Sequence, residues 1–236
     1  MKSLDSQCVL ELDAVSLNYR SGRASFDGGI HRVLNSVSFK LYEGETLGII
    51  GRNGVGKTTL LRLMAGIIEP TCGVVRRKPG KTASLLTIAL GFRPDLSGRD
   101  NALLSAMLQG CTKSEARLYL EDIKEFSELG DSFEEPVKTY SSGMRSRLGF
   151  TTALLTRVDI LLIDEVLSVG DARFREKAQS AMKERVMGDQ TVVYVSHSDV
   201  QVKSLCNRAI WIKDAKICAE GSPEEVVGDY NAHLKE

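Results

Sequence analysis

Long apolar runs, paired cysteines and an excess of charge of one sign are all missing from this 236-residue chain. Its apolar runs are short, such as residues 47–51, whereas a membrane-spanning helix needs about 20 apolar residues. The five cysteines form no C-x-x-C pair, which favours reduced thiols over a disulfide framework or a metal site. Lys+Arg and Asp+Glu both number 31, so no overall basic charge attracts nucleic acid. Residues 1–7 contain no apolar stretch, so we expect no export signal.

What remains is an ordinary globular composition, with 42% hydrophobic and 26% charged residues. The length allows one large domain or two small ones. Buried strands are predicted at 46–50, 160–163 and 191–195, and helices at 58–65 and about 172–187. Such alternation is typical of an α/β protein whose parallel sheet is covered by helices.

Other segments depart from this alternation. Residues 94–157 show helical patterns without a β-like run, so we expect a helical insertion there. Glycine-containing residues 19–32 lack periodicity and are predicted to form a surface loop between two early strands. Ser198 and Ser222 each begin a helix pattern with capping residues.

Residues 51–58 match the phosphate-binding pattern G-x-x-x-x-G-K-[ST] of a P-loop, between a predicted strand and a predicted helix. Glycines let successive backbone N–H groups turn toward phosphate oxygens, helped by the positive end of the following helix. We expect the Lys57 ammonium to reach the β- and γ-phosphates and the Thr58 hydroxyl to bind Mg²⁺. The alternative is a glycine turn followed by Lys-Thr by chance.

Two carboxylates follow the predicted strand 160–163, at the edge where open α/β sheets bind ligands. Asp164 is expected to hold the metal, often through water, and Glu165 to orient and polarise an attacking water. The alternative is an ordinary pair of acids at a helix start. His197 follows the strand 191–195; a lone histidine is usually structural, but this position beside the carboxylates favours a function.

Residues 139–144, Thr-Tyr-Ser-Ser-Gly-Met, open another helix pattern. On their own they are a serine-capped helix N-terminus, which can bind an anion. With the P-loop, the two carboxylates, residues 168–171 and His197, however, this order of motifs resembles the nucleotide-binding subunit of ABC transporters over about 9–230. Three segments are also similar to the subfamily that exports capsular polysaccharide, O-antigen or teichoic acid: 91–99, 139–144 and 168–174.

The resemblance implies an α/β fold, a P-loop NTPase core of the ABC type with an inserted helical subdomain and an N-terminal antiparallel β subdomain. Residues 1–236 would form a single nucleotide-binding domain. Its core would span about 1–88 and 157–236, and its helical subdomain about 89–156. Too few residues follow His197 for a second domain, so we expect no C-terminal carbohydrate-binding domain.

The resemblance also implies ATP and Mg²⁺ as ligands and a second copy of the chain as partner. Residues 141–143 would cap the γ-phosphate of ATP bound to the other copy in a head-to-tail dimer, and Asp171 would cross that interface. His197 would contact the γ-phosphate, and Tyr19 would stack on adenine unless it is an ordinary surface tyrosine. The residues expected to bind nucleotide are Tyr19, Gly51, Arg52, Asn53, Gly54, Val55, Gly56, Lys57, Thr58, Thr59, Ser141, Ser142, Gly143 and Asp171. Those expected to be catalytic are Lys57, Glu165 and His197, and those expected at the metal are Thr58, Thr87 and Asp164.

Thr87 marks a departure from the family pattern. The family usually places Gln or Glu at the junction to the helical subdomain, and Thr87 is the nearest matching position here. A Thr hydroxyl can bind a metal-bound water, but it is shorter and carries no charge. We expect this departure to affect the coupling between nucleotide state and a membrane partner more than nucleotide binding itself.

The predicted function is ATP hydrolysis at the cytoplasmic face of the inner membrane, driving export of a lipid-linked polysaccharide through a separate transmembrane permease. We expect residues 92–101 to form the docking surface for that permease, with Phe92, Arg93 and Leu96 exposed. The alternatives are another cargo (teichoic acid, lipid or drug) and a binding-only regulatory subunit, which the Thr87 departure favours and the intact catalytic residues oppose. No nucleic-acid partner is expected, because the basic cluster 76–78 is predicted to be a solvated hairpin edge.

Overall fold

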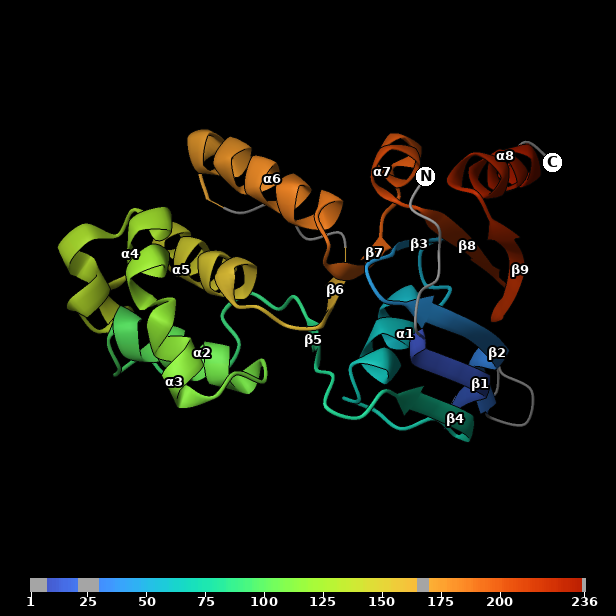
Figure 1. The fold of residues 1–236 in the computed structure, drawn as a ribbon, viewed down its shortest axis with the longest axis horizontal. Helices are drawn as coiled ribbons and strands as arrows, with labels where there is room; N and C mark the ends of the chain where they lie inside the picture. Colours follow the sequence, from blue (N-terminus) through green and yellow to red (C-terminus); the bar gives the residue numbers. More distant parts are fainter. Residues whose placement is uncertain (1–7, 21–29, 165–169, 235–236) are drawn as a thin grey trace. The chain divides into compact units, whose positions relative to one another are not determined.

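The computed structural model describes residues 8–20, 30–164 and 170–234. The chain divides into two compact units (Figure 1). The first comprises Met1–Lys81, Ile160–Glu165 and Val186–Glu236, and the second Thr82–Asp159 and Val166–Arg185. No helix in the described ranges is long and apolar enough to cross a membrane.

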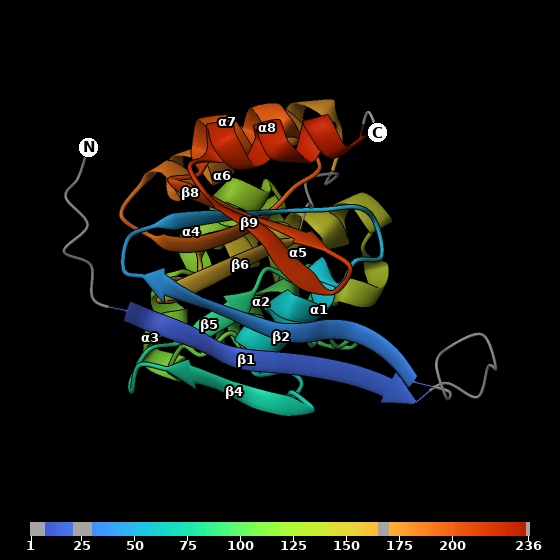
Figure 2. The same cartoon turned by 90° about the vertical axis from the view of Figure 1, so that its right-hand side faces the viewer.

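The first unit contains two sheets. One is antiparallel, in the order β2 (Ile30–Tyr42), β1 (Cys8–Arg20) and β4 (Cys72–Arg77) (Figure 2). The other has the order β6 (Ile160–Asp164), β7 (Thr191–Val195), β3 (Thr46–Ile50), β8 (Arg208–Lys213) and β9 (Lys216–Gly221). Its first four strands are parallel, and β9 pairs antiparallel with β8.

Helices pack against the strands of the first unit: α1 (Lys57–Met64), α7 (Asp199–Leu205) and α8 (Pro223–Leu234). Every residue of β3 and β7 is buried, as expected for parallel strands with both faces covered. Leu60 and Leu61 of α1 and Val202 of α7 are completely buried. Burying such a side chain contributes about 1.5–3 kcal/mol, so these apolar runs hold the carboxyl ends of the strands in place.

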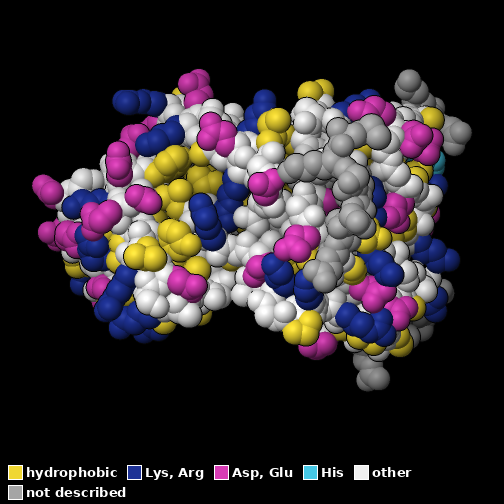
Figure 3. Space-filling view, viewed as in Figure 1, with side chains coloured by type: hydrophobic (Ala, Val, Ile, Leu, Met, Phe, Trp, Pro, Cys, Tyr) yellow, Lys and Arg dark blue, Asp and Glu magenta, His cyan; other side chains and the backbone are white. Residues whose placement is uncertain are grey.

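The second unit is mostly helical. Its elements are β5 (Ala83–Leu85), α2 (Gly98–Leu108), α3 (Lys113–Leu118), α4 (Leu120–Ser127), the 3₁₀ turns η2 (Gly130–Glu134) and η3 (Val137–Thr139), α5 (Ser142–Leu155) and most of α6 (Ala172–Met187). Its core includes the fully buried Ala102, Ile123, Phe133 and Leu148. On the face shown in Figure 3, apolar side chains gather over these helices among charged side chains of both signs.

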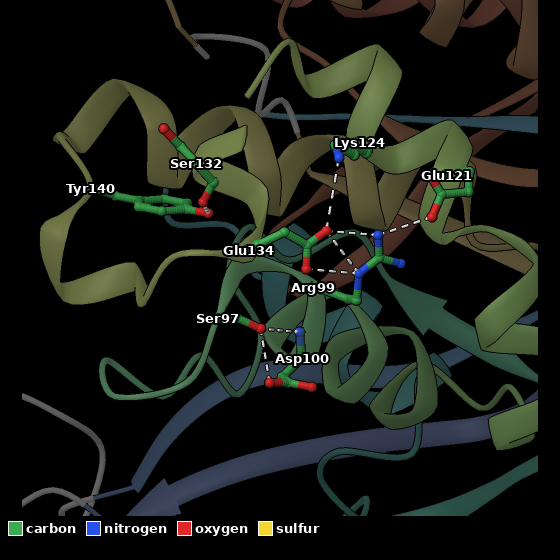
Figure 4. A network of polar contacts seen from close by, with 8 residues as sticks. All are labelled: Ser97, Arg99, Asp100, Glu121, Lys124, Ser132, Glu134 and Tyr140. Atoms are coloured by element: carbon green, nitrogen blue, oxygen red, sulfur yellow. Dashed lines mark hydrogen bonds and ion pairs between the residues drawn. The ribbon is translucent and has the colours of Figure 1, made fainter. Parts of the chain in front are cut away.

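A polar network joins the beginning of α2 to α4 and η2 (Figure 4). The Arg99 guanidinium donates to Glu134 at 2.8–3.0 Å and to Glu121 at 2.9 Å, and its carbon lies 5.1 Å from the Phe133 ring centroid. The hydrogen bond from Arg99 holds the pKa of Glu134 below its usual value. Beside this network, the Tyr140 hydroxyl donates to the Ser132 carbonyl. These contacts connect segments that lie far apart in the sequence.

The α/β fold class expected from the sequence is confirmed, including the antiparallel N-terminal sheet and the helical insertion. The predicted strands 46–50, 160–163 and 191–195 match β3, β6 and β7, and the predicted helix 172–187 matches α6. Both predicted caps also form. Ser198 Oγ accepts from the Gln201 N–H at 3.4 Å, and Ser222 and Glu225 make a reciprocal pair.

The predicted loop 19–32 is wrong at both ends. β1 continues to Arg20 and β2 begins at Ile30, with Tyr19 opposite His31 across the antiparallel pair. The glycines that suggested a loop all lie at 22–29, and residues 21–29 are outside the described part of the chain. Backbone pairing therefore includes Tyr19, Arg20 and residues 30–32, which the composition had assigned to a loop.

The basic cluster 76–78 was also assigned to the wrong local structure. Arg76 lies on β4, an edge strand that pairs with β1 rather than part of a hairpin. Its guanidinium contacts Asp13 at 2.9 Å and Glu11 at 3.4 Å on the neighbouring strand. The cluster is thus partly neutralised within its own sheet.

Candidate functional site

The loop between β3 and α1 adopts a backbone that requires glycine. Gly51 and Gly56 have φ values of +154° and +104°. A Cβ added at Gly51 would lie 2.5 Å from the Ile212 carbonyl oxygen, and one at Gly56 would lie 2.9 Å from the Val33 oxygen. A side chain does not fit at either position. Glycine therefore allows the loop to wrap tightly and to bring its N–H groups to the start of α1.

Lys57 is the first residue of α1, and its side chain turns back into the loop. It is only 6% exposed, and its Nζ donates to the carbonyls of Gly51 at 2.6 Å and Arg52 at 3.0 Å. The loop carbonyls therefore hold the ammonium against the loop. A buried ammonium needs such partners, because its desolvation would otherwise be costly.

Thr58 and Asp164 meet at the carboxyl edge of the parallel sheet. The Thr58 hydroxyl donates to Asp164 Oδ2 at 2.6 Å, joining the second residue of α1 to the last residue of β6. A hydroxyl and a carboxylate are the hard oxygen donors that Mg²⁺ takes in phosphate sites. The pair predicted for the metal thus fits a magnesium ion by its chemistry and by its convergence.

A pocket of about 320 Å³ opens beside this pair on the first unit. Nine of the residues predicted from the sequence line it: Tyr19, Asn53, Gly54, Gly56, Lys57, Thr58, Thr59, Asp164 and His197. Tyr19 is 46% exposed, so its ring is accessible at the pocket. The structure therefore brings the tyrosine, the loop, the carboxylate and the histidine to one place.

Two lining residues were missed by the sequence reasoning, His31 and Val33. Both lie near the start of β2: His31 is in the segment that had been assigned to a loop, and Val33 directly follows that segment. His31 reaches the pocket because it pairs with Tyr19 across β1 and β2. Only the register of that pair, which depends on contacts between separate strands, could have indicated them.

Several predicted site residues lie elsewhere. Glu165 falls outside the described residues. Gly51 lies in the wrapped loop, and Arg52 and Val55 line a neighbouring pocket instead. Thr87 is an exposed residue of the second unit, between β5 and α2.

Residues 141–143 form the beginning of α5 in the second unit. Ser141 Oγ accepts from the Met144 N–H at 3.1 Å, so the predicted serine cap is present, and Ser141 and Ser142 are both exposed. Further along α5, a Cβ added at Gly149 would lie 2.4 Å from the backbone nitrogen of Ala89. The absence of a side chain at Gly149 thus lets the segment after Thr87 pack directly on this helix.

Asp171 also serves as a helix cap. Its Oδ1 accepts from the Phe174 N–H at 2.9 Å at the beginning of α6. The predicted docking segment 92–101 is only partly exposed. Leu96 and Arg93 face solvent, whereas Phe92 is half-buried against the helical core, so its expected full exposure is corrected.

Comparison with protein families gives a match to the model described as "ABC transporter" over residues 34–168. The chain is 41% identical to an O-antigen export system ATP-binding protein, RfbB, of Klebsiella pneumoniae, covering 86% of this chain and 82% of that protein. It is 45% identical to the teichoic acids export ATP-binding protein TagH of Listeria monocytogenes serotype 4b (strain F2365), covering 86% and 60%. A further RfbB, from Myxococcus xanthus, is 41% identical over 89% of this chain and 48% of its own length. The chain therefore spans only about half to three fifths of some relatives.

Solved structures share the fold. An ATP binding subunit of an ABC transporter superposes with a TM-score of 0.71 at 19% identity, covering 94% of this chain and 93% of that one. A dimeric ATP-binding cassette in a post-hydrolysis state, bound to ADP and Pi, gives a TM-score of 0.69 at 22% identity, covering 91% and 98%. At these identities the likeness concerns the fold alone.

Proposed function

The chain belongs to the ABC transporter family, and we propose that it is the ATP-hydrolysing subunit of an exporter for a lipid-linked polysaccharide. The observation that carries the proposal is the pocket shared by Lys57, Thr58, Asp164 and His197. The names of the relatives, which export O-antigen or teichoic acid, supply the class of cargo.

In the proposed reaction a water attacks the γ-phosphorus of ATP, the bond to the bridging oxygen of ADP breaks, and inorganic phosphate leaves. The loop amides and Lys57 would neutralise the phosphate oxygens in this step. Thr58 and Asp164 would hold Mg²⁺, which supplies further positive charge to the β- and γ-phosphates. Glu165 would orient the water, and His197 would contact the γ-phosphate.

A second copy of the chain would complete the site. We propose that Ser141, Ser142 and Gly143 at the beginning of α5 contact the γ-phosphate held by the other copy, and that Asp171 crosses the same interface. The exposed N-terminus of α5 supports this role, because the first N–H groups and the dipole of a helix attract an anion. Tyr19, exposed at the rim of the pocket, would stack on the adenine.

The membrane partner would be a separate permease, so the subunit would act at the cytoplasmic face of the inner membrane. Segment 92–101 is our candidate for the contact, because Arg93 and Leu96 are exposed there and the buried Asn101 side chain fixes the backbone beneath them. Thr87 would take the place of the family's usual Gln or Glu near this segment. If Phe92→Ala and Arg93→Glu both leave assembly with the permease and transport unchanged, segment 92–101 is not the docking surface.

Replacing Glu165 with Gln tests the enzymatic role. We expect turnover to fall by about 10²–10³ while ATP binding is preserved, because only an interaction made in the transition state is lost. Lys57→Ala should weaken nucleotide binding itself. Glu176→Gln, at an exposed position on α6, is the matched control and should leave both quantities unchanged. Full ATPase activity in the Glu165→Gln variant would reject the assignment.

The cargo requires a separate experiment. Teichoic acid is the second candidate, because the Listeria relative is named for its export. Purifying the chain with its membrane partner and identifying the bound lipid-linked glycan by mass spectrometry distinguishes the two. A bound drug or simple lipid in place of a glycan would contradict the proposed cargo class.

A further inference from the structure

A second pocket adjoins the P-loop on the first unit, and its walls from the β8–β9 turn and α8 have no role in the proposed ATP hydrolysis. Its volume is about 410 Å³, larger than the 320 Å³ of the candidate nucleotide pocket. Its walls come from the start of β2, P-loop residues 52–55, the turn between β8 and β9, and the end of α8. Volumes of about 300–1,000 Å³ are usual for small-molecule sites.

One wall of this pocket is aromatic. The ring centroid of Trp211 on β8 lies 5.8 Å from that of Tyr230 and 5.4 Å from that of His233, both on α8. The Trp211 and Tyr230 rings meet edge to face, at 69°. Trp211 is only 9% exposed, so the half-buried Tyr230 and His233 provide most of the accessible part of this wall. Rings held against one another in this way form a rigid apolar surface on which a planar group can pack.

The remaining polar lining is predominantly basic. Arg32, Arg52 and Lys213 contribute three positive charges, and Asp214 contributes the single carboxylate among the lining residues. The Lys213 ammonium lies 6.0 Å from the centroid of the Trp211 ring. A cation beside an aromatic surface suits a ligand that combines a negative charge with a ring.

The pocket is also preformed at its turn. Asp214 and Ala215 both have left-handed backbones, with φ values of 48° and 65°, as a tight two-residue hairpin turn requires. The Asn35 N–H donates to the Ala215 carbonyl at 2.7 Å, which fixes this turn to β2. Ordering this wall would therefore cost little of the binding free energy of a ligand.

We propose that this pocket binds an anion carrying a planar ring, of the size of a nucleoside monophosphate. The ring packs against Tyr230 and the exposed edge of Trp211, and the phosphate binds Lys213 and Arg32. Because His31 and Asn53 line both pockets, a ligand here alters nucleotide affinity through the shared wall. The inference holds whatever cargo the transporter carries.

Trp211 makes the site directly measurable, since it is the only tryptophan in the chain. The experiment titrates uridine monophosphate into protein saturated with Mg²⁺ and ADP and follows tryptophan fluorescence, with excitation beyond the absorption of uracil. Uridine monophosphate lacks the β- and γ-phosphates that the P-loop binds, and ADP already fills the first pocket. We expect a saturable change in emission and a matching shift in the affinity for ADP.

Charge-reversal variants test whether the basic side chains of the pocket bind the phosphate. Lys213→Glu should weaken uridine monophosphate binding by about tenfold or more, because it removes a charge-assisted contact and adds repulsion. Lys216→Glu is the matched control, since Lys216 is exposed on the same hairpin outside the pocket. Arg32→Glu, on β2, tests the same effect should Lys213→Glu fail to fold.

Four results would overturn the proposal. The first is no saturable change in emission, and the second is equal weakening by the Lys216→Glu control. The third is competitive displacement of uridine monophosphate by ADP, which would make the pocket an extension of the nucleotide site. Binding of free uridine or inorganic phosphate as tight as that of uridine monophosphate would refute the combined ring-and-anion class.

Discussion

Asn101 offers a direct test of how the segment before α2 is held in place. Its side chain is completely buried. Its Oδ1 accepts from the Arg93 N–H at 2.6 Å, and its Nδ2 donates to the carbonyls of Arg93 and Leu96 at 3.0 Å and of Ser97 at 2.8 Å. One amide group therefore organises the backbone of the proposed docking segment.

The cost of removing this amide follows from its partners. Each hydrogen bond contributes about 1 kcal/mol net. The three carbonyls keep a second donor, because backbone N–H groups also reach Arg93, Leu96 and Ser97 at 2.9–3.2 Å, so the Arg93 N–H is the group that loses its partner. An unpaired buried N–H costs about 1–3 kcal/mol, so we expect Asn101→Ala to lower the free energy of unfolding by about 1–3 kcal/mol and the melting temperature by about 2–12 °C.

A second substitution at this position changes charge but hardly changes shape. Asn101→Asp keeps an acceptor for the Arg93 N–H, but directs a carboxylate oxygen toward carbonyl oxygens in a buried site. At neutral pH it should destabilise more than Asn101→Ala. Protonation restores one donor, so the stability of this variant should rise relative to that of the wild type as the pH falls.

Ser105→Ala is the matched control on the same helix. Ser105 is 1% exposed, and in the described part of the chain its Oγ has no hydrogen-bond partner. Removing a buried, unsatisfied hydroxyl should leave stability unchanged or raise it. Urea unfolding and amide hydrogen exchange at 93–97 measure the effects. If Asn101→Ala stays within about 0.5 kcal/mol of the wild type, the amide does not hold the segment.

Two further predictions concern ionisable groups. Because Arg99 lowers the pKa of Glu134, this pair stabilises the fold above the ordinary glutamate pKa and loses that effect as the pH falls through the lowered value. Glu134→Gln should therefore weaken the acid dependence of urea unfolding, and identical pH profiles for variant and wild type would contradict this. Burial raises the pKa of the Cys206 thiol to about 12, so iodoacetamide should label the exposed Cys72 and Cys218 long before Cys206. Mass spectrometry over a labelling time course measures the order in which these cysteines react. Simultaneous labelling of all three would show that Cys206 is accessible.

The local features of the fold were predictable from the sequence because they depend on neighbouring residues. Strands β3 and β7 are uninterrupted apolar runs that both faces of the sheet bury. The caps at Ser141, Ser198 and Ser222 use side chains within three residues of the N–H groups they satisfy. The P-loop was equally predictable, because its backbone requires glycine at fixed positions within the loop itself.

Features that depend on register or on distant partners could not be predicted in this way. His31 and Val33 line the candidate nucleotide pocket because of how β2 pairs with β1. Arg99 meets Glu134 only because α2 packs against η2, which lies far along the sequence. No periodicity in one segment carries information about a residue 35 positions away.

Two residues proposed to act across a subunit contact, Ser141 and Asp171, are also helix caps in this chain. An alanine scan at these positions would confuse two effects, because losing a cap alone costs about 0.5–2 kcal/mol. Ser141→Thr and Asp171→Asn keep the cap and change only the group offered to a partner. Loss of activity in these conservative variants, with unchanged helix stability, is therefore the outcome that separates a recognition defect from a folding defect.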